Sequence, residues 1–90
     1  MIILINRFDS NNIRGKNNTS INIDDVITIN GYKFQLLAII DHHGRNSVSG
    51  HYTAWLFFPN DTLFCNDSII ETKKFMGQSN SGYLLFYFLT

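Results

Sequence analysis

The dipeptide Asn30-Gly31 constrains the fold most strongly, because it joins two runs of strand-forming residues. Both central residues of a two-residue type I′ hairpin turn need a positive φ angle, which Asn and Gly adopt readily. The run before it, "INIDDVITI" (21–29), predicts one or two short strands. The run after it, "YKFQLLAII" (32–40), becomes more apolar along its length, which predicts a long return strand in the centre of a sheet.

Short apolar runs separated by polar segments continue through the chain. Four further segments are expected to be strands, at 1–5, 51–58, 62–70 and 82–89, the third as one strand or two. Polar segments at 9–20 and 42–50 are expected to be loops, and 71–81 is expected to hold a helical turn or a loop. Eight Phe and four Tyr also favour strands. The sequence therefore predicts a mainly β, antiparallel fold in one domain spanning residues 1–90.

Charge and cysteine content exclude several classes of partner. Lys plus Arg and Asp plus Glu number seven each and neither sign is clustered, so the chain lacks an electrostatic footprint for nucleic acid or acidic lipid. No apolar run reaches the ~20 residues that span a bilayer, and the N-terminal run is too short for a signal peptide. The single cysteine, Cys65, excludes an internal disulfide and suits a reducing compartment. We therefore expect a cytoplasmic or nuclear protein that binds neither nucleic acid nor membrane.

The strongest candidate for chemistry is His51, in the stretch "SGHYTAW". A turn centred near Asn60 predicts an antiparallel register summing to about 119 or 120, which puts His51 opposite Ser68 or Ile69 and within one diagonal of Asn66 and Asp67. An oxygen that accepts the imidazole N–H fixes the tautomer and leaves the other nitrogen as a base. A slip of one residue exchanges which of the two polar residues shares the face of His51, so both stay candidates.

Structural interpretations of the same residues compete with the catalytic one. His51 also fits a core histidine that is satisfied by a backbone carbonyl, and the polar run 66–68 fits a capped turn. His42 and His43 are expected at a strand end, facing water. Cys65 fits a small apolar filler better than a nucleophile. A zinc site from the three histidines and Cys65 lacks paired ligand spacing, so the sequence predicts no metal and no cofactor.

The order of the motifs resembles the C-terminal third of the catalytic domain of ubiquitin-specific proteases, the papain-like deubiquitinases. The resemblance rests on five segments in order: "IILINRFD" followed by Lys16-Asn17, "YKFQLLAIIDHHG", "SGHYTAW" as the Gly-His-Tyr box, "LFCNDSII" as the Asn/Asp box and "GYLLFYF" as the closing strand. It covers residues 2 to 89. It implies that this antiparallel sheet is the histidine-bearing half of an α+β papain-like cysteine protease fold, and that residues 1–90 are a single partial peptidase domain.

The resemblance also assigns roles to individual residues. His51 is implied to be the general base and Asn66 to orient its imidazole, while Asp67 is implied to support the oxyanion or the triad. The loop 43–50 is implied to border the channel for the ubiquitin C-terminal tail. Gly50 and Tyr52 are the candidate substrate-binding residues, Gly50 because the absence of a side chain lets an extended Gly-Gly tail pass close to the backbone.

The chain departs from the family in one decisive respect, because the box that carries the nucleophilic cysteine is absent. Cys65 occupies the position before the triad Asn and does not replace that nucleophile. The resemblance implies thiol-dependent hydrolysis of the isopeptide bond after the ubiquitin C-terminal Gly, but the sequence leaves open whether this chain is an enzyme. The expected partners are ubiquitin or a ubiquitinated protein, and a chain that bears the cysteine box. The alternatives are a non-catalytic module that binds the ubiquitin tail or acts as a decoy, and a structural remnant.

Overall fold

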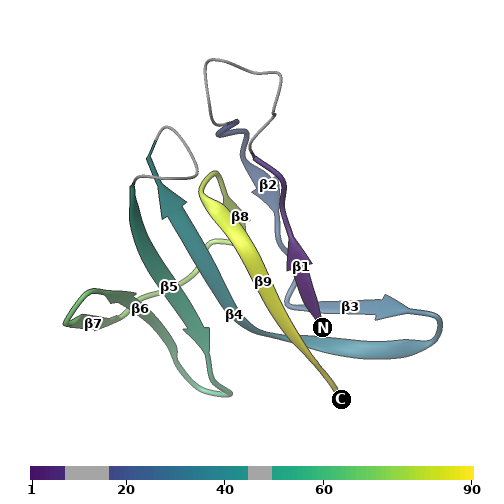
Figure 1. Ribbon diagram of the computed structural model, residues 1–90. Helices are drawn as coiled ribbons and strands as arrows, with labels where there is room; N and C mark the ends of the chain where they lie inside the picture. The colour runs from purple at the N-terminus through teal and green to yellow at the C-terminus, as the bar shows by residue number, and fades with distance from the viewer. Residues whose placement is uncertain (8–16, 45–49) are drawn as a thin grey trace.

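The computed structural model describes residues 1–7, 17–44 and 50–90. Within these ranges, every helix or strand assigned is a β-strand (Figure 1). The strands are β1 (Ile2–Leu4), β2 (Ile21–Asn22), β3 (Val26–Ile29), β4 (Tyr32–His43), β5 (His51–Phe57), β6 (Thr62–Asn66), β7 (Ile69–Thr72), β8 (Gln78–Ser79) and β9 (Gly82–Leu89). The predicted mainly β, antiparallel fold is therefore confirmed. The motif residue Phe8 and residues 9–16 of the expected loop at 9–20, which include the motif residue Lys16, lie outside the described ranges.

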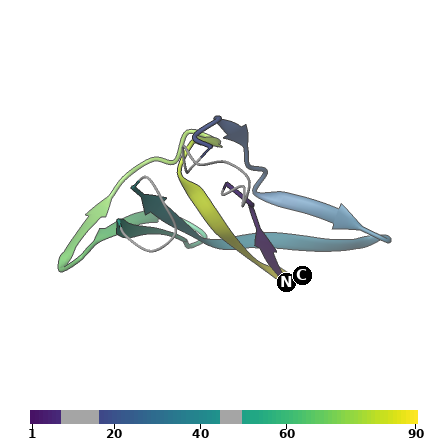
Figure 2. The ribbon, with the colours of Figure 1, turned by 45° about the horizontal axis from the view of Figure 1, so that its top comes forward.

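The strands form one seven-stranded sheet and one two-stranded sheet. The large sheet has the order β1-β9-β4-β5-β6-β7, and β3 pairs with the first part of β4. The long strand β4 thus contacts β3, β5 and β9, which confirms its predicted central place (Figure 1). The small sheet pairs β2 with β8 and lies over one side of the large sheet (Figure 2).

The hairpin between β3 and β4 forms at the predicted dipeptide. Asn30 and Gly31 have φ angles of 52° and 83°, so both central turn residues adopt the left-handed conformation. The first strand pair beside the turn joins Ile29 to Tyr32. Asn tolerates this conformation and Gly adopts it without steric cost, which is why the dipeptide was a reliable signal.

Strand β4 is longer than the sequence predicted, because it continues through Asp41, His42 and His43 instead of ending at residue 40. These residues pair with the start of β5, in the register His43 with His51. The expectation that His42 faces water was wrong: its residue is 1% exposed, and its backbone N–H donates to the carbonyl of Ser81 at 2.9 Å. His43 lies at the strand end and is exposed, as expected.

Strand register divides the side chains of the large sheet between two faces. Direct partners share a face and successive residues alternate. We call the side that carries Ile39, Trp55 and Phe64 the front face, and the side that carries Ala54 and Cys65 the back face. The buried apolar core is centred on the front face and consists of Ile23, Leu36, Ile39, Leu85 and Tyr87.

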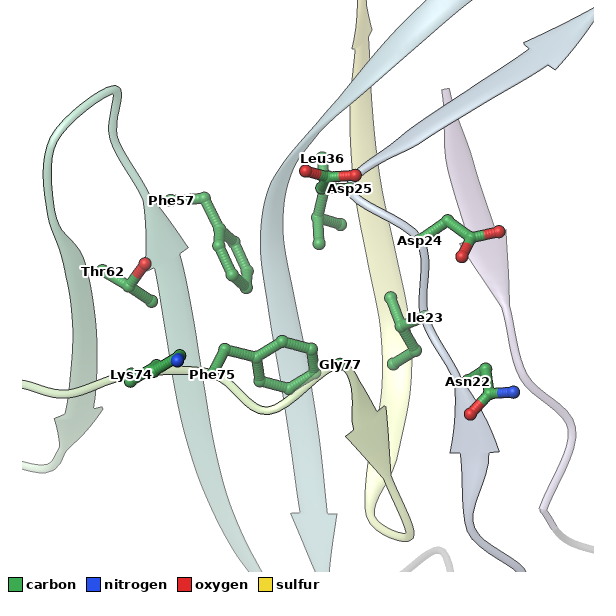
Figure 3. Close-up of a pocket in the computed structure, with 10 residues that line it drawn as sticks. All are labelled: Asn22, Ile23, Asp24, Asp25, Leu36, Phe57, Thr62, Lys74, Phe75 and Gly77. Carbon is green, nitrogen blue, oxygen red and sulfur yellow. The ribbon is translucent and has the colours of Figure 1, made fainter.

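The segment after β7 covers part of the front face. Residues 73–77 form no regular element before β8 begins, so the expected loop, and not a helical turn, is present there. Phe75 from this segment and Phe57 from β5 point into a cavity of about 500 Å³, with Ile23 and Leu36 on its other side (Figure 3). The apolar core is therefore completed by residues 73–77, which belong to no strand.

Arg7 ties three parts of the chain together. The residue is 3% exposed, and its guanidinium donates to the backbone carbonyls of Gly82 (2.6 Å), Thr19 (2.8 Å) and Ser79 (3.2 Å). Burial lowers the pKa of this guanidinium, while the charge of Asp41 acts in the opposite direction. The planar fork of an arginine is suited to several carbonyls at once. Arg7 thereby fixes the beginning of β9, beside the end of β4.

Candidate active site

His51 begins β5 and Asn66 ends β6, and the register of these strands places both residues on the front face. Trp55 is paired with Phe64, so the register sums to 119, one of the two predicted values. His51 lies four residues before Trp55 and Asn66 lies two residues after Phe64, so alternation keeps both on the same side. Asn66, and not Asp67, is therefore the residue of β6 that shares the face of His51, a point that the sequence alone left open.

The prediction that Ser68 or Ile69 lies opposite His51 was wrong. Strand β6 ends at Asn66, the chain turns there, and Ile69 is paired with Asn66 in the next hairpin. The direct partner of His51 is His43 on β4. The sequence argument extended the β5–β6 ladder beyond the point where the second turn interrupts it.

The imidazole of His51 is held by the side chain of Asn66. The Nε2 atom of His51 lies 2.6 Å from Oδ1 of Asn66. Because a carbonyl oxygen can only accept, Nε2 carries the proton and Nδ1 carries the lone pair. His51 is exposed, so this lone pair belongs to a side chain that another molecule can approach. The arrangement is that of an oriented base.

Asp67 occupies a different position from Asn66. It is exposed in the turn between β6 and β7 and has a φ angle of 54°. Asp adopts the left-handed conformation more readily than most residues, so the turn itself accounts for this residue type. The role of Asp67 in supporting the oxyanion or the triad stays a prediction.

Gly50 has a structural reason to lack a side chain. Its φ angle is 139°, and a Cβ atom built there would overlap the carbonyl oxygen of His43 and would lie 2.7 Å from Nε2 of His42. The close approach of this backbone to β4 sets where His51 enters the sheet. The passage of a substrate tail beside Gly50 stays a prediction, and residues 45–49 of the adjoining loop lie outside the described ranges.

Tyr52 follows His51 and therefore points to the back face. Its ring packs edge-on against the ring of His42, with 5.0 Å between centroids, and lies 6.4 Å from that of Tyr83. The residue remains 51% exposed. Its substrate-binding role stays a prediction, and the structure gives it a packing role beside His42.

A second chain of hydrogen bonds on the front face was not predicted. The hydroxyl of Thr53 donates to Oδ2 of Asp41 (3.0 Å) and lies 2.8 Å from Nε2 of His43. Asp41 is buried, and burial raises the pKa of its carboxyl group, while the hydrogen bond from Thr53, the nearby His43 and the polar groups of Trp55 and Ser81 partly offset that effect. Continued alternation through "IIDHH" was the available signal, since it puts Asp41 and His43 on the same face.

The residues considered for a zinc site are divided between the two faces. Cys65 is the direct partner of Ala54 and lies on the back face, as does His42, whereas His43 and His51 lie on the front. Within the described residues, no group of three or more His, Cys, Asp and Glu side chains is arranged to hold a metal ion. The same division keeps the thiol of Cys65 away from the imidazole of His51.

A histidine whose imidazole is held by an asparagine amide is the geometry that the base has in the Cys-His-Asn sites of papain-like hydrolases. The family model for ubiquitin carboxyl-terminal hydrolase matches residues 1–87, and the chain belongs to this family. The expected resemblance to the ubiquitin-specific protease domain is thus confirmed. No helix long and apolar enough to span a membrane occurs in the part of the chain that the structure describes.

Individual proteins show how much of a larger domain the chain represents. It is 42% identical over 57 residues to ubiquitin carboxyl-terminal hydrolase 51 of Mus musculus, covering 61% of this chain and 8% of that protein. It is 38% identical over 60 residues to ubiquitin carboxyl-terminal hydrolase 27 of Homo sapiens, and this match covers 64% of this chain and 14% of that protein. The chain therefore spans a small fraction of the curated relatives that it matches.

The fold is shared with a solved structure of the Ubp8-Sgf11-Sgf73-Sus1 SAGA DUB module. The TM-score is 0.86 at 20% sequence identity, and the match covers 100% of this chain and 24% of that chain. The strands described above therefore have the same arrangement as about a quarter of that longer chain.

Proposed function

We propose that this chain supplies the base and its orienting amide to a thiol-dependent ubiquitin hydrolase site, and that the thiol comes from another polypeptide segment. The observation that carries the proposal is the 2.6 Å contact between Nε2 of His51 and Oδ1 of Asn66 in an exposed position. Family membership supports ubiquitin as the substrate. Cys65 is unsuited to be the nucleophile because it lies on the back face.

The chemistry follows from the tautomer. Nδ1 of His51 accepts the proton of the incoming thiol, and the resulting imidazolium is stabilised through its Nε2–H, which Asn66 accepts. The thiolate attacks the carbonyl carbon of the terminal Gly, and the imidazolium returns its proton to the leaving amine as the thioester forms. Water then hydrolyses the thioester, with His51 again acting as the base.

Two surfaces support the proposed partners. A groove of about 490 Å³ opens on the front face and is lined in part by Asp41, His43 and Trp55, so it can receive an extended tail beside the site. On the back face, two rows of side chains cross the sheet without a charged residue, and all of them are apolar except Thr72 at the end of one row. The other row runs from Leu4 to Ile70, which are 60% and 65% exposed. Such a surface suits packing against a further polypeptide segment.

The test is complementation in trans. The 90-residue chain is mixed with a family chain that carries the cysteine box and lacks the segment matched here, and fluorophore release from a ubiquitin C-terminal reporter is measured. We expect turnover only in the mixture, a fall of about 10²- to 10⁴-fold in His51→Ala, and unchanged turnover in Cys65→Ser.

Other outcomes assign the alternatives. Ubiquitin binding that requires the terminal Gly-Gly, without turnover in the mixture, would identify a binding or decoy module. Neither binding nor turnover would leave a structural remnant. Loss of turnover in Cys65→Ser would show that the thiol had been wrongly excluded.

A further inference from the structure

Strand β7 lies at one end of the order of strands in the large sheet (Figure 1). Its outer side pairs with no other strand in the part of the chain that the structure describes. All four of its residues are exposed, and it pairs with β6 without a bulge and contains no proline. An uninterrupted edge of this kind is a template for a further strand.

The backbone groups of Ile70 and Thr72 point away from β6. The N–H of Lys73 donates to the carbonyl of Thr62 at 2.9 Å, which shows that the backbone of residue 73 faces β6. Backbone groups alternate in direction along an antiparallel strand, so the odd-numbered residues of β7 bond to β6 and the even-numbered residues face outwards. The free edge therefore presents the N–H and C=O groups of Ile70 and Thr72.

We propose that β7 pairs, antiparallel and about a twofold axis, with β7 of a second copy of this chain. Direct partners in a sheet share a face, and bonded partners both carry groups that point towards the other strand. In such a pair, even-numbered residues of β7 therefore lie opposite even-numbered residues of the second copy. Several registers meet this condition, and they differ in which charges they bring together.

Charge favours the register in which Ile70 lies opposite Ile70 of the second copy. In this register Glu71 faces Ile69, and Lys73 lies level with Asp67 of the second copy, which gives two pairs of opposite charge. Both Asp67 and Lys73 are exposed, so their side chains are at the surface. Moving one copy along by one pair brings Glu71 opposite Glu71 in one direction and level with Asp67 in the other. Like charges directly opposite destabilise a strand pair, whereas opposite charges stabilise it.

The back face supports the same register. Ile70 ends the apolar row that begins at Leu4, and it is 65% exposed. In the dimer it packs against Ile70 of the second copy, so the two rows join across the twofold axis. Such an interface closes at two copies, and a contact of one short strand from each copy gives a weak dimer that depends on concentration.

Dimer formation also bears on the candidate site. Ile69 is the direct partner of Asn66, so a second copy bound along β7 steadies the hairpin that carries the orienting amide. The association itself does not depend on the hydrolase function. The complementation assay and the measurements below therefore test the two independently.

The test is sedimentation of the 90-residue chain over concentrations from about 10 µM to about 1 mM, a range that suits a weak interface. Amide hydrogen exchange is followed by NMR in the same samples. We expect a reversible monomer–dimer equilibrium, and slower exchange at the amide of Ile70 as the dimer forms. The amide of Lys73 bonds within each copy and serves as the internal control, so its exchange should not depend on concentration.

Two matched variants distinguish the register. Ile70→Lys puts two lysines together at the twofold axis, and we expect the dissociation constant to rise at least about tenfold. Ile69→Lys makes the same change at the neighbouring exposed position and brings each new lysine opposite Glu71 of the second copy. We expect that variant to dimerise at least about twofold more tightly. Protection of the Lys73 amide in both variants shows that the hairpin is intact.

A chain that remains monomeric, or a dimer in which the Ile70 amide exchanges as fast as in the monomer, would overturn the inference. Unchanged association in Ile70→Lys would place the contact on another surface. Weaker association in Ile69→Lys would reject the register. Protection of the Ile70 amide only when the cysteine-bearing chain is added would assign this edge to that chain instead of to a second copy.

Discussion

Oδ1 of Asn66, the last residue of β6, lies 2.6 Å from Nε2 of His51, the first residue of the neighbouring strand β5. This contact depends on alternation from the paired residues Trp55 and Phe64, which are part of the sheet interior. The orientation of the base is therefore set by strand register as well as by the hydrogen bond itself.

Replacing Asn66 should release the imidazole of His51. In Asn66→Ala we expect the Nε2–H tautomer to lose its preference, and turnover in the complemented assay to fall by about tenfold or more, because the imidazolium loses its orienting acceptor. Histidine ¹⁵N chemical shifts measure the tautomer directly. The control Asp67→Gly keeps the left-handed turn and removes only a carboxylate, and an equal effect there would show that Asp67 orients the ring.

Replacing Gly50 should disturb the entry of the chain into β5. Gly50→Ala places a Cβ atom against the carbonyl of His43 and the ring of His42, and we expect unfolding free energy to fall by about 1–3 kcal/mol. Gly31→Ala is a matched control, because φ is also positive there but nothing lies within 4 Å of the added Cβ. Urea unfolding compares them, and a smaller loss for Gly50→Ala than for Gly31→Ala would contradict the proposed overlap.

Replacing Arg7 should loosen the beginning of β9. Arg7→Lys cannot reach the carbonyls of Gly82, Thr19 and Ser79 together, so we expect a loss of about 2–4 kcal/mol in unfolding free energy, from buried acceptors left without donors. Lys33→Gln, at an exposed position, should change stability by less than about 0.5 kcal/mol. Thermal unfolding checks both, and equal melting temperatures would exclude a clamping role for Arg7.

Alkaline pH should weaken the fold through Tyr87. Its hydroxyl donates to the carbonyl of Asp24 at 2.6 Å, and burial, followed by the charges of Asp24 and Asp25, raises its pKa above 10.0. The folded chain thus keeps a proton that the unfolded chain loses, so this contribution is complete below pH 10 and is lost as pH rises through the folded-state pKa. Urea unfolding between pH 8 and pH 11 should show a shallower decline for Tyr87→Phe. Identical slopes would contradict the assignment.

The parts of the fold that local sequence signals determine could be predicted. Asn30-Gly31 marked a hairpin because only a few residue types tolerate its backbone, and the turn near Asn60 gave the register that brings Asn66 towards His51. The burial of His42 could not be predicted in the same way, since it follows from pairing with β5 and from contacts with Tyr83, far along the chain. Long-range pairing also created the Asp41–Thr53 hydrogen bond.

The alternation of faces along β5 has a further consequence for how such a chain can change over time. The side chains of His51, Thr53 and Trp55 lie on the front face with the candidate site, whereas those of Tyr52, Ala54 and Leu56 form the opposite surface. Substitutions in the second set can alter which polypeptide the sheet associates with, while the surroundings of the imidazole are left as they are. Substitutions on one face of the strand can therefore change the binding partner of the sheet while the residues around His51 stay the same.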